Sequence, residues 1–196
     1  MHKLKPLLTS SHLSLHRAGR YLWQDLSLQV NPGDLCVIRG ENGSGKTSLL
    51  KVFARILPPS IGHVACHGGS IGYVGHSSGL YPTLSVWRYL QTQAIMAGKS
   101  PEIATKQMNL WGLESWADLP LGKLSFGQQR RTALARLGIH NADLWLLDEP
   151  TASLDTNAIT ILWQVIAAKQ NQGGAVIMAT HHEVPLPIQH QIHCHE

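Results

Sequence analysis

The sequence Gly40-Glu-Asn-Gly43-Ser-Gly45-Lys46-Thr47 matches the eight-residue P-loop pattern in full. A continuous apolar run at residues 35–38 precedes it and is typical of a strand buried on both faces. Residues 46–56 follow with the apolar spacing of a helix, which two prolines then end. A buried strand before the loop and a helix after it are the context that the pattern requires, so the sequence predicts a P-loop fold.

The residue types of this loop suit the phosphates of a nucleotide. Glycines let backbone N–H groups turn inward, and the following helix adds the positive end of its dipole. Lys46 can reach the outer phosphates, and the Thr47 hydroxyl can ligate Mg²⁺. We therefore expect nucleotide binding by the whole loop: Gly40, Glu41, Asn42, Gly43, Ser44, Gly45, Lys46 and Thr47.

The rest of the chain alternates predicted strands with predicted helices, which indicates an α/β fold with a mainly parallel sheet. Residues 77–123 have few strand signals and are expected to form a helical insertion in that core. The predicted strands are 26–30, 35–38, 144–147 and 175–178, and the predicted helices are 46–56, 84–97, 102–111, 128–137 and 155–168.

Length and composition narrow the classes further. The chain has 196 residues, of which 43% are apolar, and this favours one domain over residues 1–196. No run approaches the roughly 20 apolar residues that a bilayer crossing needs, and the start lacks a secretory signal, so we expect a cytosolic location. A net charge of +4 without a dense basic block gives no reason to expect a nucleic-acid partner.

Four further motifs follow the P-loop in a fixed order. Leu124-Ser125-Phe126-Gly127-Gln128 precedes Leu144-Trp-Leu-Leu-Asp148-Glu149-Pro150 by about twenty residues, and Ala152-Ser-Leu-Asp155 and Thr180-His181 come later. They resemble the signature, Walker B, D-loop and H-loop of the ABC transporter ATP-binding subunits. This resemblance covers nearly the whole chain. It implies the ABC type of P-loop fold, with an antiparallel β part beside the parallel core, and ATP and Mg²⁺ as ligands.

The resemblance also implies roles for individual residues. Asp148, at the end of a buried strand, is expected to hold Mg²⁺ together with Thr47, and Glu149 is expected to be the general base for the attacking water. His181 resembles the switch histidine that contacts the γ-phosphate. His76 stands where most relatives carry the glutamine of the Q-loop. Since imidazole changes charge near neutral pH, we expect activity to fall in mildly acidic solution, partly through His76.

The signature implies that two chains share each ATP. Ser125 and Gly127 are expected at the start of a helix, where N–H groups and a hydroxyl form an anion site. In the family this site closes over the ATP of the other subunit, so the resemblance implies a homodimer in which Asp155 belongs to the D-loop. The residues expected to face the partner's ATP are Ser125, Phe126, Gly127 and Gln128, and little effect is expected from phenylalanine at the second of them.

Within this family the chain is most similar to the ATP-binding subunit of the haem exporter of bacterial cytochrome c maturation. The similarity rests on the short chain, on Gly75-His76 and on the segments 124–137 and 173–181. It implies integral-membrane partner subunits at the cytoplasmic face of the bacterial inner membrane, where hydrolysis helps to release a haem-loaded chaperone. An exporter of lipid, peptide or drug remains the alternative, and a non-transport ABC ATPase is disfavoured because the chain has a single P-loop and no room for long coiled coils.

Weaker signals leave two questions open. The adenine-stacking residue of relatives lies about thirty residues before the P-loop lysine, which points to Arg17 or Tyr21. The residues His190, His193, Cys194 and His195 could bind metal, although an edge strand or frayed tail is the favoured interpretation. Under that interpretation, removing the last six residues leaves transport intact.

Overall fold

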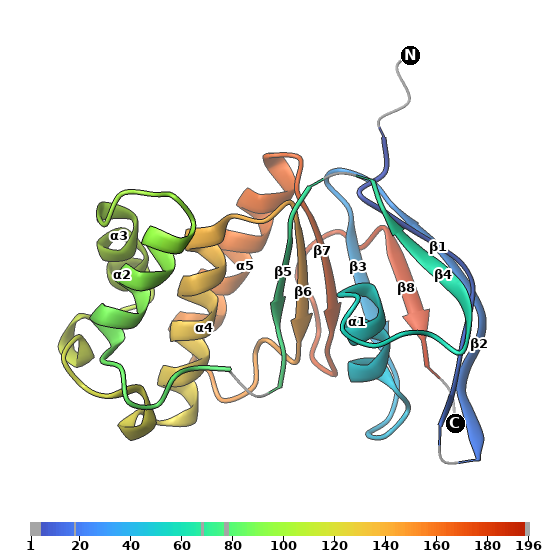
Figure 1. The fold of residues 1–196 in the computed structure, drawn as a ribbon, viewed down its shortest axis with the longest axis horizontal. Helices are drawn as coiled ribbons and strands as arrows, with labels where there is room; N and C mark the ends of the chain where they lie inside the picture. The colour runs from blue at the N-terminus through green and yellow to red at the C-terminus, as the bar shows by residue number, and fades with distance from the viewer. Residues whose placement is uncertain (1–4, 18, 68, 77–78, 195–196) are drawn as a thin grey trace.

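The computed structural model describes residues 5–17, 19–67, 69–76 and 79–194 (Figure 1). Within these ranges a five-stranded parallel sheet forms the core, in the order β5–β6–β7–β3–β8. Its strands are β3 (Leu35–Arg39), β5 (Ile71–Val74), β6 (Leu144–Asp148), β7 (Ala175–Ala179) and β8 (His190–His193). A second, antiparallel sheet has the order β2–β1–β4, from β1 (Leu8–Arg17), β2 (Arg20–Val30) and β4 (Ile61–Cys66). Both parts of the expected fold are confirmed.

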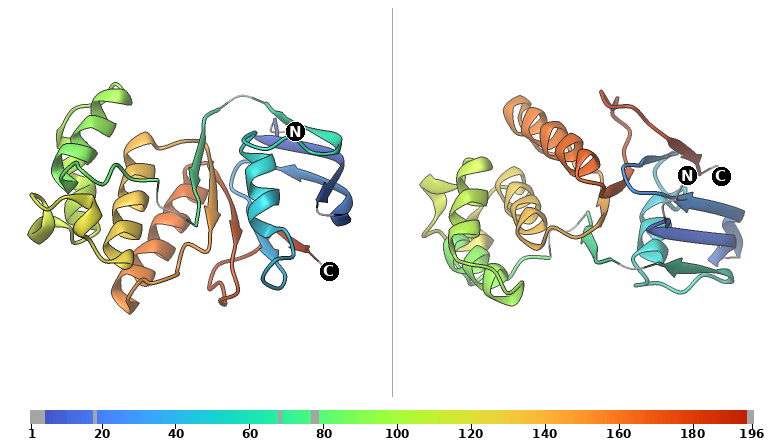
Figure 2. Two further views of the ribbon diagram at one scale, coloured as in Figure 1. Left: turned by 60° about the horizontal axis from the view of Figure 1, so that its bottom comes forward. Right: turned by 90° about the horizontal axis from the view of Figure 1, so that it is seen from above.

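The three central strands of the parallel sheet, β6, β7 and β3, are buried on both faces. Helix α1 (Lys46–Phe53) packs between this sheet and the antiparallel sheet, while α4 (Phe126–His140) and α5 (Thr156–Asn171) cover the other face (Figures 1 and 2). Alternate residues of each strand therefore enter different cores. On β3, Val37 packs with the α4 side and Ile38 with the α1 side. This explains why the central strands have continuous apolar sequences.

The predicted helical insertion contains α2 (Val86–Met96) and α3 (Glu102–Leu110), followed by short 3₁₀ turns at Glu114–Trp116 and Leu121–Lys123. Buried Tyr89 and Trp111 join it to α4 in one core. Ser85 caps α2 by accepting a hydrogen bond from the Arg88 N–H. Residue 77, where the insertion was expected to begin, lies outside the described residues. Within the described residues, none of the helices has the length and apolar character of a membrane span.

Several element boundaries differ from the sequence-based expectation. Helix α4 starts at Phe126, two residues before the predicted start, because Ser125 supplies the cap. Strand β1 was not predicted at all. Its pairing with β2 shifts register three times between Ser10 and His16, and His12 has a positive φ of 49°. These bulges break the two-residue alternation by which a strand is recognised in a sequence.

Candidate nucleotide-binding site

The P-loop runs from the end of β3 to the start of α1, as its sequence requires. Gly45 is the N-cap of α1 in the left-handed conformation, with φ of 98°. Gly40 has a φ of 148°, and a Cβ atom there would lie 2.4 Å from the Cys194 carbonyl oxygen. Glycine is therefore needed at position 45 for backbone conformation and at position 40 for both conformation and space. The loop arches over the N-terminus of α1, the end of a helix that attracts anions.

A cavity of about 300 Å³ opens at this loop. It collects residues that are far apart in the sequence, from the P-loop, the Walker B segment, the H-loop and the end of β5. This edge of a parallel sheet is where α/β folds bind ligands. The lining residues are Leu22, Asn42, Gly43, Gly45, Lys46, Thr47, Ser48, His76, Asp148, Glu149 and His181.

Lys46 and Thr47 are held in place by hydrogen bonds. The Lys46 Nζ donates to the carbonyl oxygens of Gly40, at 2.7 Å, and Glu41, at 2.9 Å. The Thr47 hydroxyl donates to the Asp148 carboxylate at 2.8 Å, and Asp148 is almost fully buried. A hydroxyl and a carboxylate in contact are hard oxygen donors of the kind that Mg²⁺ prefers. The donor set therefore fits this ion.

Glu149 has an unusual backbone and a free carboxylate oxygen. Its φ is +46° although Pro150 follows it, a combination that costs free energy for a non-glycine residue. Its N–H donates to the Ala179 carbonyl at 2.8 Å, which holds the turn in place. The Oε1 atom is buried without a hydrogen bond, and the His181 Nε2 lies 3.4 Å from it. Glu149 lines the cavity, and a carboxylate oxygen without a hydrogen-bond donor has the capacity to accept a proton from water.

Two histidines line the cavity. The His181 Nε2 lies 2.9 Å from the Lys46 Nζ and 3.2 Å from the Asn42 Oδ1, while the side chain remains 46% exposed. His76 follows β5, lines the same cavity and is exposed. The structure therefore places both expected histidines beside the P-loop and Glu149.

Arg130 is a residue of this region that the sequence analysis did not single out. Its guanidinium, only 4% exposed, donates to the Gly75 carbonyl at 2.7 Å and to the carbonyls of Asp148 and Glu149 at 3.3 Å each. Burial lowers the pKa of Arg130, while Asp148 and Glu149 oppose that shift. Arg130 thus ties the helix after the signature to both carboxylate residues and to the segment before His76.

The signature lies elsewhere. Ser125 caps α4 and forms a capping box with Gln128, in which the Ser125 N–H donates to the Gln128 Oε1 at 2.8 Å. Phe126 is 82% exposed, and Gly127 packs so tightly that a Cβ atom would lie 2.3 Å from the Ser153 carbonyl oxygen. None of residues 125–128 lines the cavity formed by the described residues. In the capping box, the backbone N–H groups of Ser125 and Gln128 already donate hydrogen bonds within the chain. The groups that remain for binding an anion are therefore the N–H groups of residues 126 and 127 and the Ser125 hydroxyl.

Asp155 has contacts within its own chain. Its carboxylate caps α5 by accepting from the Ala158 N–H at 2.9 Å and forms an ion pair with Arg131. Since Arg131 belongs to α4, this pair connects the start of α5 to the helix that carries the signature. The expected D-loop residue therefore joins the start of α5 to the second turn of α4.

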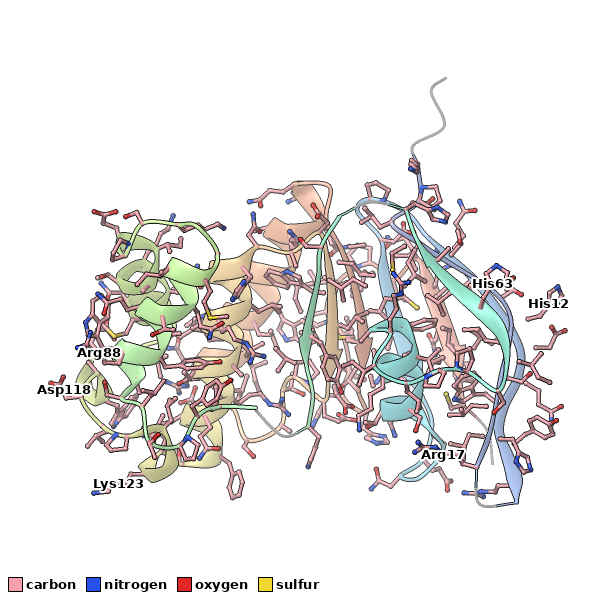
Figure 3. All side chains as sticks on the ribbon, in the orientation of Figure 1. His12, Arg17, His63, Arg88, Asp118 and Lys123 are labelled. Carbon is pink, nitrogen blue, oxygen red and sulfur yellow. The ribbon has the colours of Figure 1, made fainter. Side chains whose placement is uncertain are left out.

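The expected adenine-stacking residues do not line the cavity. Arg17 is the last residue of β1 (Figure 3), and Tyr21 lies on β2. Tyr21 packs edge-on against His16, with ring centroids 5.1 Å apart. Leu22 lines the cavity instead. Leu22 and Tyr21 are neighbours on β2 and face opposite sides of the strand. The residue that stacks on adenine stays a prediction.

His190 and His193 belong to the edge strand β8, as favoured. His190 hydrogen-bonds Asp34 at 3.2 Å, and within the described residues no group of three potential ligands could hold a metal. His195 lies outside the described residues. Cys194 is different, because it is buried against the P-loop at Gly40 and burial raises the pKa of its thiol to about 11. This segment is therefore no frayed tail.

Together, the parallel core, the P-loop and the separate signature define an ATP-binding subunit of the ABC class. The family model for ABC transporters matches residues 23–152. The chain belongs to the ABC transporter family and, within it, groups with the cytochrome c biogenesis ATP-binding export proteins.

Two relatives illustrate the similarity. The cytochrome c biogenesis ATP-binding export protein CcmA 2 of Cupriavidus metallidurans is 36% identical over 192 residues, which cover 91% of each chain. The CcmA protein of Ruegeria pomeroyi is 39% identical over 179 residues, covering 91% of this chain and 87% of the relative.

Solved structures share the fold. The ATP-binding subunit of an ABC transporter superimposes with a TM-score of 0.81 at 21% identity, covering 89% of this chain and 79% of the other. A dimeric ATP-binding cassette in a post-hydrolysis state, bound to ADP and phosphate, gives 0.77 at 22% identity over 89% and 88%.

Proposed function

We propose that the chain hydrolyses ATP at the cavity beside the P-loop. Lys46 and the loop amides bind the phosphates, and Thr47 with Asp148 holds Mg²⁺. When bound, the ion neutralises charge on the outer phosphates. Glu149 accepts a proton from the attacking water, and His181 and His76 hydrogen-bond the γ-phosphate and the water. The observation that carries this proposal is the free, buried Oε1 of Glu149 at the same cavity as the Lys46 ammonium.

We further propose that the active form is a homodimer. The cavity of one chain contains no signature residue among its described lining, and the signature of the same chain includes the exposed Phe126. A second chain can bring residues 125–128 to the open side of the cavity. The ATP of each site then lies between the P-loop of one chain and the signature of its partner.

The identity of the relatives supports a role in cytochrome c biogenesis. In this proposal the dimer binds integral-membrane subunits of a haem exporter at the cytoplasmic face of the bacterial inner membrane. Hydrolysis there helps to release a haem-loaded chaperone. The relatives' names carry the assignment, because no residue of the nucleotide site recognises a cargo.

Purification of tagged chain from gently solubilised membranes tests this role, with haem absorbance and co-purifying proteins measured together. Co-purification with small haem-handling membrane subunits and a haem chaperone is expected. A Lys46→Ala variant is the matched control, because it should retain the membrane partners while losing hydrolysis. Recovery of an unrelated permease would replace haem by another cargo, and recovery without any membrane protein would contradict a transport role.

A further inference from the structure

Arg39 is the last residue of β3 and directly precedes the P-loop. Its side chain reaches away from that loop toward the segment after β7. The Nη1 atom donates to the Thr180 carbonyl oxygen at 2.8 Å and to the His182 carbonyl oxygen at 2.5 Å. These two carbonyls stand on either side of His181, so one guanidinium holds the backbone both before and after the switch histidine.

The His181 side chain contacts Lys46, Asn42 and Glu149 at the cavity. It is 46% exposed, and its ring contacts are with polar groups of the same cavity. ATP binding changes the surroundings of those groups, since Lys46 and Asn42 line the phosphate site. The direction in which the imidazole points must therefore be set mainly by its backbone, because peptide orientation determines where the side chain leaves the chain.

The backbone of Arg39 is held in place by the neighbouring strands. β3 lies between β7 and β8, and the Arg39 carbonyl accepts a hydrogen bond from the Cys194 N–H at 2.8 Å. The neighbouring Ile38 carbonyl accepts from the Thr180 N–H at 3.3 Å. Charge-assisted hydrogen bonds from a guanidinium are among the stronger ones in proteins. The start of the P-loop and the H-loop are thus joined at one residue.

We propose that Arg39 is a positioning residue that holds His181 at the distance from the P-loop needed to meet the γ-phosphate. The inference rests on the role proposed for His181 in hydrolysis. Arg39 does not line the cavity and touches no substrate position. Its effect should therefore fall on the rate of hydrolysis and leave nucleotide affinity almost unchanged, since small displacements of a reacting group slow the chemical step.

Single-turnover ATP hydrolysis, with the full chain in excess over ATP, tests the proposal. Arg39→Met removes the donors but keeps an apolar side chain of similar length. We expect its hydrolysis rate constant to fall about tenfold while ATP affinity changes by less than about twofold. Arg39→Lys should recover part of the rate. Arg88→Met is the control, because Arg88 lies on α2 at the outer end of the molecule (Figure 3).

A second pair of variants separates the inference from the proposed function. His181→Ala should itself slow hydrolysis, and full activity of that variant would contradict the role of His181. If it is slow, Arg39→Met should add no further loss in the His181→Ala background, because both substitutions then remove the same contribution. An independent further loss, or weakened ATP binding, would overturn the positioning role.

Amide hydrogen exchange of the full chain without nucleotide gives a readout that does not depend on activity. In Arg39→Met we expect faster exchange at residues 181–183 and unchanged exchange at residues 144–147. Unchanged exchange at residues 181–183 would overturn the proposal even if hydrolysis slows.

Discussion

The phosphate-binding end and the signature end of this molecule are built in opposite ways. At the first, Lys46, Asp148, Glu149 and His181 come from different elements and already meet in one cavity. At the second, the polar groups of Ser125 and Gln128 serve mainly to cap their own helix. One end is thus an assembled half of a site, and the other is a stable, exposed surface. The difference supports the proposal that the missing half comes from another chain.

The same contrast holds for backbone conformation. Glu149 adopts a positive φ before a proline, which is a strained conformation that its neighbours maintain. Ser125, by contrast, has an ordinary extended conformation with φ of −63° and ψ of 161°. Among the described non-glycine residues of the cavity, Glu149 has a positive φ, but Ser153, whose carbonyl packs against Gly127, also has a positive φ of 62°. The start of the signature helix itself is held by standard helix capping.

The largest effect is expected for Glu149→Gln at the assembled end. The amide keeps the shape of the side chain but cannot accept the proton, so hydrolysis should fall by about 10²- to 10⁴-fold. ATP should still bind and should trap a dimer, detectable by sedimentation. Glu114→Gln, in an exposed 3₁₀ turn, is the control. A variant that hydrolyses ATP normally would remove Glu149 from the mechanism.

The next effect is expected at the signature, from Ser125→Asp and Ser125→Asn. Both residues are good N-caps, so both should leave the monomer's stability nearly unchanged. The aspartate places a negative charge where the partner's triphosphate is expected. ATP-driven dimerisation of the aspartate variant should weaken by about 10²-fold relative to the asparagine variant, as measured by light scattering in a Glu149→Gln background. Equal dimerisation of the two would show that no anion approaches Ser125.

A smaller effect is expected from removing residues 191–196. The sequence alone suggests that this segment is dispensable, but most of β8 and buried Cys194 support β3 and Gly40. We expect ATP affinity to fall by about tenfold in an equilibrium binding assay, because Gly40 of the P-loop loses the residue against which it packs. Wild-type affinity in the shortened chain would restore the original expectation.

The smallest effect concerns stability far from the cavity. Burial, with Arg136 and Lys99, lowers the pKa of His140. The unfolded chain therefore takes up more protons, and the free energy of unfolding should decrease as the pH falls below about 6.5. His140→Gln should make that decrease shallower in urea unfolding at pH 7.5 and 5.5, with hydrolysis at pH 7.5 unchanged. An identical decrease in both proteins would contradict the assignment.

The features best predicted from the sequence are those that depend on residues adjacent in the chain. The P-loop and the central strands depend on short local patterns, and the structure has them where the patterns lie. The bulged strand β1 was not predicted, because its register shifts interrupt the alternation of apolar and polar residues that marks a strand. Counting from the lysine pointed to Arg17, with Tyr21 nearby, and neither lines the cavity, whereas Leu22 does.

Contacts to distant backbone could not be predicted. Arg130 and Arg39 donate hydrogen bonds to backbone carbonyl oxygens of residues up to 143 positions away in the sequence. Every residue has such a carbonyl. No sequence pattern therefore marks the acceptor. The sequence also could not reveal that Cys194 lies against Gly40, because that contact depends on where β8 joins the sheet.

The central claim is that each complete site combines the P-loop of one chain with the signature of another. We would test it by mixing Lys46→Ala with Ser125→Asp chains, each carrying Glu149→Gln and a tag of different size, and adding ATP with Mg²⁺. The account predicts that neither variant dimerises alone and that the mixture forms heterodimers, because one intact composite site remains in the pair. Dimers of either variant alone, or a mixture that stays monomeric although Glu149→Gln alone dimerises, would contradict it.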